Sequence, residues 1–118
     1  MARHLEAVYD TSILVDYLMG RDSAQKEFDR YSRRGISFIT WMELQTGARS
    51  ETETDAIDLF LREFRVIELS RQVVRRAIEI RKRNRLPLPD AIILATAQLE
   101  SAPLVTSNRQ LAKLAERQ

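Results

Sequence analysis

Residues 7–12, Ala7-Val8-Tyr9-Asp10-Thr11-Ser12, form a short apolar run that ends on a carboxylate and passes directly into a helix start. Apolar, β-branched and aromatic residues favour a buried strand over the first three positions. Thr11 or Ser12 can cap the helix that follows, and Gly20 is a natural end for it. The sequence therefore predicts a strand that leads straight into a helix, with Asp10 at the junction.

The same alternation of strand and helix continues along the chain. Apolar residues at i, i+3, i+4 and i+7 predict a helix over residues 54–64, and Gly35 is expected to end the helix before the second strand. Later strands are predicted at residues 36–40, 66–69 and 103–106. Other helices are predicted at residues 22–34, 40–46, 70–85, 90–97 and 108–116. In the helix at 70–85 the side chains expected to face inward are Val73, Val74, Ala77, Ile78 and Ile80.

Strands that alternate with helices require crossover connections, which place successive strands parallel to one another. We therefore predict an α/β fold with a mainly parallel central sheet of four or five strands and helices on both faces. With 118 residues, 44% of them hydrophobic, the chain suits a single domain spanning residues 1–118. In folds of this class ligands bind beyond the carboxyl ends of the strands.

The amino-acid composition restricts the kinds of metal site, the partners and the cellular location that we expect for this chain. The absence of cysteine excludes a disulfide framework and a thiolate metal site, so we expect any metal to be held by oxygen. The net charge of +2 is weak support for a nucleic-acid partner. No apolar run reaches the roughly 18 residues that span a bilayer, so we expect a cytoplasmic protein with no membrane partner.

Four polar residues fall near the expected carboxyl edge of the sheet: Asp10, Glu43, Asp90 and Asn108. Each also has a structural interpretation. Asp10 and Asn108 are possible helix caps, Thr40-x-x-Glu43 matches a capping box, and Asp90 suits the first turn of a helix. Acids gathered at one edge repel one another unless a cation neutralises them. Mg²⁺ or Mn²⁺ is the expected cation, because both prefer oxygen ligands.

In order and spacing, four blocks of the sequence resemble the blocks of PIN-domain ribonucleases, and the small size is most similar to VapC-type toxins of toxin–antitoxin modules. The blocks are Tyr9-Asp10-Thr11-Ser12, Ser37-Phe38-Ile39-Thr40-Trp41-Met42-Glu43-Leu44, Leu88-Pro89-Asp90-Ala91-Ile92-Ile93-Leu94-Ala95 and Leu104-Val105-Thr106-Ser107-Asn108. The resemblance covers nearly the whole chain. It implies an endoribonuclease, an RNA substrate, a VapB-type antitoxin partner and a homodimer.

The resemblance also implies roles for individual residues. Asp10, Glu43 and Asp90 would be the acidic triad that binds Mg²⁺ or Mn²⁺ and carries catalysis by metal-assisted phosphodiester hydrolysis. Glu43 is either a direct ligand or a base. The hydroxyls that line the pocket would be those of Thr11 or Ser12 together with Thr106. Many family members have a fourth acid where this chain has Asn108, and an amide there brings no charge for a second metal.

A basic segment extends from Ser70 to Arg85, with seven Lys or Arg residues against the single acid Glu79. Such a segment can follow an RNA backbone and make binding depend on salt, or it can be the solvated face of a helix. The candidate RNA-binding residues are Arg75, Arg76, Arg81, Lys82, Arg83 and Arg85.

Two other functional classes lack their characteristic residues in this chain, and a third stays open. A phospho-acceptor receiver domain should have an acidic pair after the first strand, but Asp10 is followed by Thr11. A haloacid-dehalogenase-type phosphatase needs a second acid two residues after Asp10, where Ser12 stands. A catalytically weak binding module that docks RNA or a protein stays open as the alternative.

Overall fold

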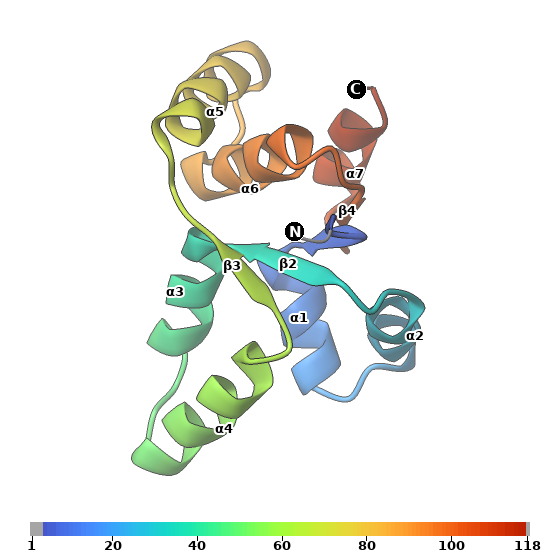
Figure 1. The fold of residues 1–118 in the computed structure, drawn as a ribbon, viewed down its shortest axis with the longest axis vertical. Coiled ribbons are helices and arrows are strands. Elements are labelled where there is room, and N and C mark those ends of the chain that lie inside the picture. Colours follow the sequence, from blue (N-terminus) through green and yellow to red (C-terminus); the bar gives the residue numbers. More distant parts are fainter. Residues whose placement is uncertain (1–3, 118) are drawn as a thin grey trace.

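The computed structural model describes residues 4–117 as a sheet flanked by helices (Figure 1). In chain order the elements are β1 (Ala7–Tyr9), α1 (Thr11–Leu18), α2 (Asp22–Arg30), β2 (Arg34–Ser37), α3 (Phe38–Thr46), α4 (Glu51–Leu61), β3 (Arg65–Ile67), α5 (Arg71–Asn84), α6 (Leu88–Leu99), β4 (Leu104–Val105) and α7 (Arg109–Glu116). No helix in the described part of the chain has both the length and the apolar character needed to cross a membrane.

The four strands form one parallel sheet in the order β3-β2-β1-β4. Val8 of β1 is paired with Gly35 of β2 on one side and with Leu104 of β4 on the other. The order reverses between β1 and β4, because the chain moves outward from β1 to β3 and then returns to the opposite side. The expected α/β fold with a parallel central sheet is confirmed, and the sheet has four strands.

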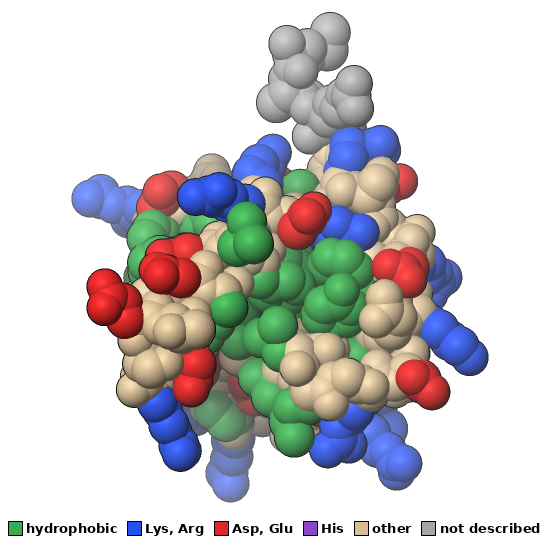
Figure 2. Space-filling model, turned by 90° about the horizontal axis from the view of Figure 1, so that it is seen from below, with side chains coloured by type: hydrophobic (Ala, Val, Ile, Leu, Met, Phe, Trp, Pro, Cys, Tyr) green, Lys and Arg blue, Asp and Glu red, His purple; other side chains and the backbone are tan. Residues whose placement is uncertain are grey.

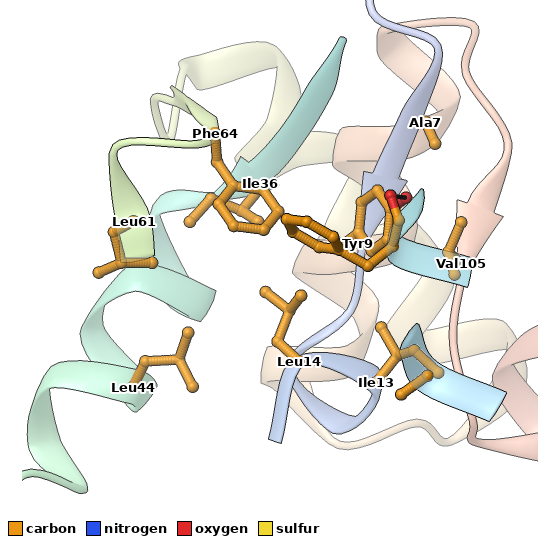
Figure 3. Packing of buried hydrophobic residues seen from close by; sticks show 11 residues of the cluster. Ala7, Tyr9, Ile13, Leu14, Ile36, Leu44, Leu61, Phe64 and Val105 are labelled. Carbon is orange, nitrogen blue, oxygen red and sulfur yellow. Dashed lines mark hydrogen bonds between the residues drawn. The ribbon is translucent and has the colours of Figure 1, made fainter. Parts of the chain in front are cut away.

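Helices cover both faces of the sheet and enclose two apolar clusters. In Figure 1, α1 to α4 lie on one side of the sheet and α5 to α7 on the other. The first cluster contains Tyr9 of β1 together with Leu14, Ile36, Leu44 and Phe64 (Figure 3). The second joins α5, α6 and α7 through residues that include Val73, Ala77, Ile80, Leu94 and Leu111. Tyr9 of β1 belongs to the first cluster and α6 contacts β1 as well, so helices pack against the strand that leads to Asp10 on both faces of the sheet.

The second strand begins and ends earlier than the sequence indicated, so the helix before it ends earlier and the helix after it begins earlier. The helix α2 ends at Arg30, and the expected role of Gly35 as a helix end is wrong, because Gly35 is a strand residue. A Cβ at Gly35 would lie 2.5 Å from Leu5 Cδ1, so a larger residue there would displace the end of the Leu5 side chain that packs over the strand. The strand ends at Ser37, and the next three residues are helical.

The capping interpretations have mixed outcomes. The Ser37 side chain accepts a hydrogen bond from the Ile39 N–H and begins α3, so the capping box at Thr40 and Glu43 is wrong. Asp10 rather than Thr11 or Ser12 occupies the N-cap position of α1, and its side chain makes no capping hydrogen bond. The cap predicted for Ser70 is confirmed by its hydrogen bond from the Val73 N–H.

Two predictions about helix faces and ends also differ from the structure. On α5, Val73, Ala77 and Ile80 are buried as expected, but Val74 and Ile78 are exposed. Their predicted inward orientation is wrong, since α5 is an outer helix that packs against α6 along a narrow stripe (Figure 1). The helix α4 runs from Glu51 to Leu61, three residues earlier than predicted at each end.

Candidate functional site

The candidate site lies where the carboxyl ends of β1 and β4 meet, at the point where the strand order reverses. Asp10 follows β1 and Thr106 follows β4. The Asp10 side chain is only 4% exposed, and its Oδ2 accepts hydrogen bonds from Thr106 Oγ1 at 2.6 Å and Ser12 Oγ at 2.7 Å. These two short bonds to hydroxyl donors compensate the carboxylate for its loss of water.

Glu43 reaches the same region from α3, which starts directly after β2. Glu43 is exposed, and its Oε1 accepts a hydrogen bond of 2.7 Å from Thr11 Oγ1. The Thr11 hydroxyl also contacts Thr40 Oγ1 at 3.0 Å. Consecutive residues at the start of α1 therefore donate hydrogen bonds to different acids. Thr11 donates to Glu43, and Ser12 donates to Asp10.

Asp90 completes the group from the first turn of α6. Burial raises the pKa of Asp90 above its ordinary value, and the negative charges of Asp10 and Glu43 raise it further. The three acids are therefore near enough to repel one another. Within residues 4–117, however, no three histidine, cysteine or acidic residues stand close enough to enclose one ion. Both findings hold together, because charge repulsion acts over longer distances than metal coordination.

A comparison with protein families decides the identity of the fold that carries this group. The family model described as PIN domain matches residues 7–117. The chain belongs to the PIN domain family. The resemblance noted from the four sequence blocks is confirmed at this level, because the match covers all four.

Solved structures similar to this PIN domain come from toxin–antitoxin systems. A toxin–antitoxin complex from Klebsiella pneumoniae is 39% identical, covers 86% of this chain and 86% of its own, and has a TM-score of 0.81. VapBC2 from Rickettsia felis, bound to a DNA fragment from its promoter, is 24% identical, with coverages of 92% and 91% and a TM-score of 0.78. VapBC-1 from nontypeable Haemophilus influenzae is 22% identical, with coverages of 94% and 92% and a TM-score of 0.73. The last two show the same fold. No curated protein gives a significant match.

Asn108 acts as a helix cap in this PIN domain. Its side-chain oxygen accepts a hydrogen bond from the Leu111 N–H at 3.1 Å at the start of α7. Its backbone N–H donates to Thr106 Oγ1 at 3.0 Å. Asn108 therefore touches the site through its backbone, by supporting the hydroxyl that bonds to Asp10, while its amide oxygen is directed to α7.

The basic residues of α5 and its C-cap residue Arg85 differ in exposure. Arg75, Arg81, Lys82, Arg83 and Arg85 are exposed, whereas Arg76 is partly buried and donates to Gln98 Oε1 of α6 at 2.8 Å. Arg76 also lines a cavity of about 400 Å³ near the start of β4, at the opposite edge of the sheet from Asp10. Arg76 is therefore held within the fold, and the other five are free to meet solvent or a ligand.

One residue of the site was not recognised from the sequence as part of it. The sequence predicts Thr40 as the end of the second strand and the start of the next helix, yet the residue is fully buried and its hydroxyl contacts Thr11. The available signal was its position three residues before Glu43, which places both side chains on one face of α3.

The raised pKa of Asp90 leads to a prediction about stability and pH. Because the folded protein binds this proton more tightly than the unfolded chain does, the stability of the metal-free protein should fall as pH rises from about 3.8 through the raised pKa. Asp90→Asn should remove this part of the slope, measured by urea unfolding between pH 4 and 7. Asp22→Asn, which changes an exposed acid in the first turn of α2, should leave the slope unchanged. Equal slopes for wild type and Asp90→Asn would contradict the repulsion among the acids.

Proposed function

We propose that this PIN domain is an Mg²⁺- or Mn²⁺-dependent endoribonuclease that acts as the toxin of a VapBC-type toxin–antitoxin system. The observation that carries the proposal is the position of three acids, Asp10, Glu43 and Asp90, beyond the carboxyl ends of parallel strands, near enough for Asp10 and Glu43 to raise the pKa of Asp90. The similarity to a toxin–antitoxin complex at 39% identity supports the biological role.

The donor set suits a hard divalent ion, because it consists of carboxylates with hydroxyls behind them. Asp10, Asp90 and Glu43 would hold the ion, and their side chains would have to move closer together to do so, because no three acids of residues 4–117 enclose one position. When bound, the ion supplies Lewis-acid stabilisation of the charge that builds on the phosphodiester. Asp10 is the most fixed of the three, since two hydroxyls bond one of its oxygens and the side chain is nearly buried.

Glu43 is the acid best suited to accept a proton from the attacking water. Its side chain is exposed, so it can meet a water without first displacing protein atoms. One hydroxyl, that of Thr11, orients its carboxylate. A general base must approach the attacking water within hydrogen-bond distance and be held in a defined orientation, and Glu43 meets both requirements. Asn108 brings no negative charge, so we assign one tightly held ion to the site.

The proposed activity can be tested directly with RNA. The purified protein should produce discrete new RNA 5′ ends in the presence of Mn²⁺ or Mg²⁺, and a chelator should abolish them reversibly. Protein freed of any co-purified antitoxin is needed for the assay. Binding of RNA without cleavage at any concentration of either ion would favour the alternative, a catalytically weak module that docks RNA or a protein.

Four exposed basic residues of α5 and the C-cap residue Arg85 are proposed RNA contacts; the four are Arg75, Arg81, Lys82 and Arg83. Contacts of this kind neutralise phosphates, so RNA affinity should fall steeply with salt concentration. Arg76 is a weaker candidate, because it is already bonded to Gln98. A homodimer is proposed on the family resemblance, and light scattering that gives a monomer at all concentrations would contradict it.

An apolar groove beside Glu43 is the proposed docking surface for the antitoxin. It is lined by Val15, Leu18 and Met19 of α1, Leu44 of α3 and Ile57 of α4, with acids at its rim, Glu43 and Glu53. Figure 2 looks at the molecule from the side of α1 and α4 and shows hydrophobic side chains gathered among charged ones. A segment with apolar residues and a basic residue complements such a groove, and the basic residue would be attracted to Glu43.

Leu18→Asp is expected to prevent formation of the toxin–antitoxin complex. Leu18 is 47% exposed and lines the groove, so a carboxylate there would have to be buried without a partner when an antitoxin segment binds. Leu59→Asp is the matched control, because Leu59 is 64% exposed on α4 and lies outside the groove lining. Co-purification with the cognate antitoxin would measure the effect. Equal yields of complex for both variants would place the antitoxin elsewhere.

A further inference from the structure

Thr40 differs from Ser37 and Thr96, the two other buried hydroxyl residues of the described chain, in the origin of its partner. Within residues 4–117, the buried polar side chains are those of Asp10, Ser37, Thr40 and Thr96. Ser37 caps its own helix, and Thr96 donates to the Ile92 carbonyl of its own helix, which is the usual bond of a helical threonine. The Thr40 hydroxyl instead contacts Thr11 on α1, 29 residues away in the sequence.

The Thr11 hydroxyl lies between two oxygen atoms of α3. Thr40 Oγ1 is at 3.0 Å and Glu43 Oε1 is at 2.7 Å. Thr11 Oγ1 is the donor in both contacts, so its single proton lies between the exposed carboxylate of Glu43 and the buried hydroxyl oxygen of Thr40. Two contacts on one short side chain select one rotamer of Thr11.

We propose that Thr40 is a positioning residue that acts through Thr11 to orient the carboxylate of Glu43. This inference rests on the proposed function, because Glu43 matters for catalysis only if the site hydrolyses RNA. Without the Thr40 hydroxyl, Thr11 can rotate and Glu43 loses its fixed donor. Removing a residue that orients a metal ligand typically costs about 10- to 100-fold in metal affinity or activity.

Two substitutions at Thr40 separate positioning from packing. Thr40→Val keeps the volume and loses the hydroxyl, whereas Thr40→Ser keeps the hydroxyl and loses a buried methyl group. Packing alone predicts that Ser is the more damaging change, because it leaves a small cavity. Positioning predicts the reverse order for activity. Thr96→Val is the matched control, since it removes an equally buried threonine hydroxyl whose partner is the Ile92 carbonyl.

The kinetic readout is kcat and KM for RNA cleavage at saturating Mn²⁺. We expect Thr40→Val to lower kcat about tenfold with KM nearly unchanged, and Thr40→Ser to stay within about twofold of wild type, despite a lower melting temperature. Thr96→Val should retain the wild-type kcat. If Thr40→Val kept the wild-type kcat, or if Thr40→Ser lost as much as Thr40→Val, the inference would be overturned.

The second readout does not depend on cleavage. Mn²⁺ that binds only the folded protein raises its melting temperature once its concentration exceeds the dissociation constant, and the shift then grows with the logarithm of the concentration. Thr40→Val should therefore need about tenfold more Mn²⁺ than wild type for the same shift. An unchanged Mn²⁺ requirement would overturn the inference. If the wild type failed to cleave RNA, the proposed function would fail, and a Mn²⁺ requirement raised by Thr40→Val but not by Thr96→Val would still support Thr40 as a residue that orients Glu43.

Discussion

Asp10→Asn is expected to lower the rate of RNA cleavage about 10³-fold, which corresponds to roughly 4 kcal/mol of transition-state stabilisation. Asp10 is the proposed ligand at the reversal point of the sheet, and an amide in its place carries no charge to hold the cation. The substitution keeps the size of the side chain, and its oxygen can still accept from Ser12 and Thr106.

The same change should leave the metal-free protein folded. A buried neutral amide is less costly than a buried carboxylate, and the Asp10 charge also raises the pKa of Asp90. Against this stands the weakening of two hydrogen bonds to a charged acceptor, so we expect the stability to lie within about 1 kcal/mol of wild type or above it. Urea unfolding of the metal-free proteins would measure it.

Activity and stability together make the test specific. An inactive Asp10→Asn protein that unfolds at the wild-type urea concentration would locate the loss in chemistry, and Asp22→Asn should be active and stable. Cleavage by Asp10→Asn at the wild-type rate under saturating Mn²⁺ would show that Asp10 is not a metal ligand.

Local sequence patterns were sufficient for the junction at Asp10. The run before Asp10 is apolar enough to be buried on both faces of a sheet, and the residues after it start a helix. Once the chain is seen to alternate strands and helices, the parallel sheet follows, and the carboxyl ends of its strands must share one edge. Asp10 and Asn108 are therefore expected at one edge of the sheet without any knowledge of distances, whereas Thr106 is expected there from the family resemblance. The hydrogen bond from Thr106 to Asp10 joins the ends of the two strands.

The end of the second strand could not be predicted in the same way. Residues 36–40 all suit a strand by type, but only the residues up to Ser37 have a partner in β3, where Ser37 is paired with Ile67. Both Ser37 and Thr40 can cap a helix, and the limit of strand pairing decides for Ser37. The role of Thr40 was hidden for the same reason, since its partner Thr11 comes from another element.

Local sequence patterns also could not show which apolar face of α5 is buried. A helix of period 3.6 places residues 73, 77 and 80 on one stripe and residues 74 and 78 on the next. The sequence shows that both stripes are apolar, but not how wide a surface the neighbouring helix covers. In the structure α6 covers one stripe, and α5 lies at the outside of the molecule (Figure 1).

Ile80→Ala and Ile78→Ala are expected to differ strongly, although they are the same substitution two residues apart. Ile80 is 7% exposed within the cluster that joins α5 to α6, whereas Ile78 is 45% exposed. Loss of a buried isoleucine side chain costs about 2–5 kcal/mol, and an exposed change costs about 0.5 kcal/mol or less. The difference should appear as a lower urea midpoint for Ile80→Ala at an unchanged slope.

The comparison also tests how the fold supports the site. The cluster that contains Ile80 includes Leu86 and Ala91, which flank the first turn of α6 where Asp90 lies. At a temperature well below its unfolding transition, Ile80→Ala should still cleave RNA, because the acids keep their places in the folded fraction. Equal losses of stability for the two variants would mean that the Ile78 stripe is also covered, as it would be if α5 packed against a second copy of the chain. Unfolding at two protein concentrations distinguishes that case, since a stripe covered by a second copy makes the midpoint depend on concentration.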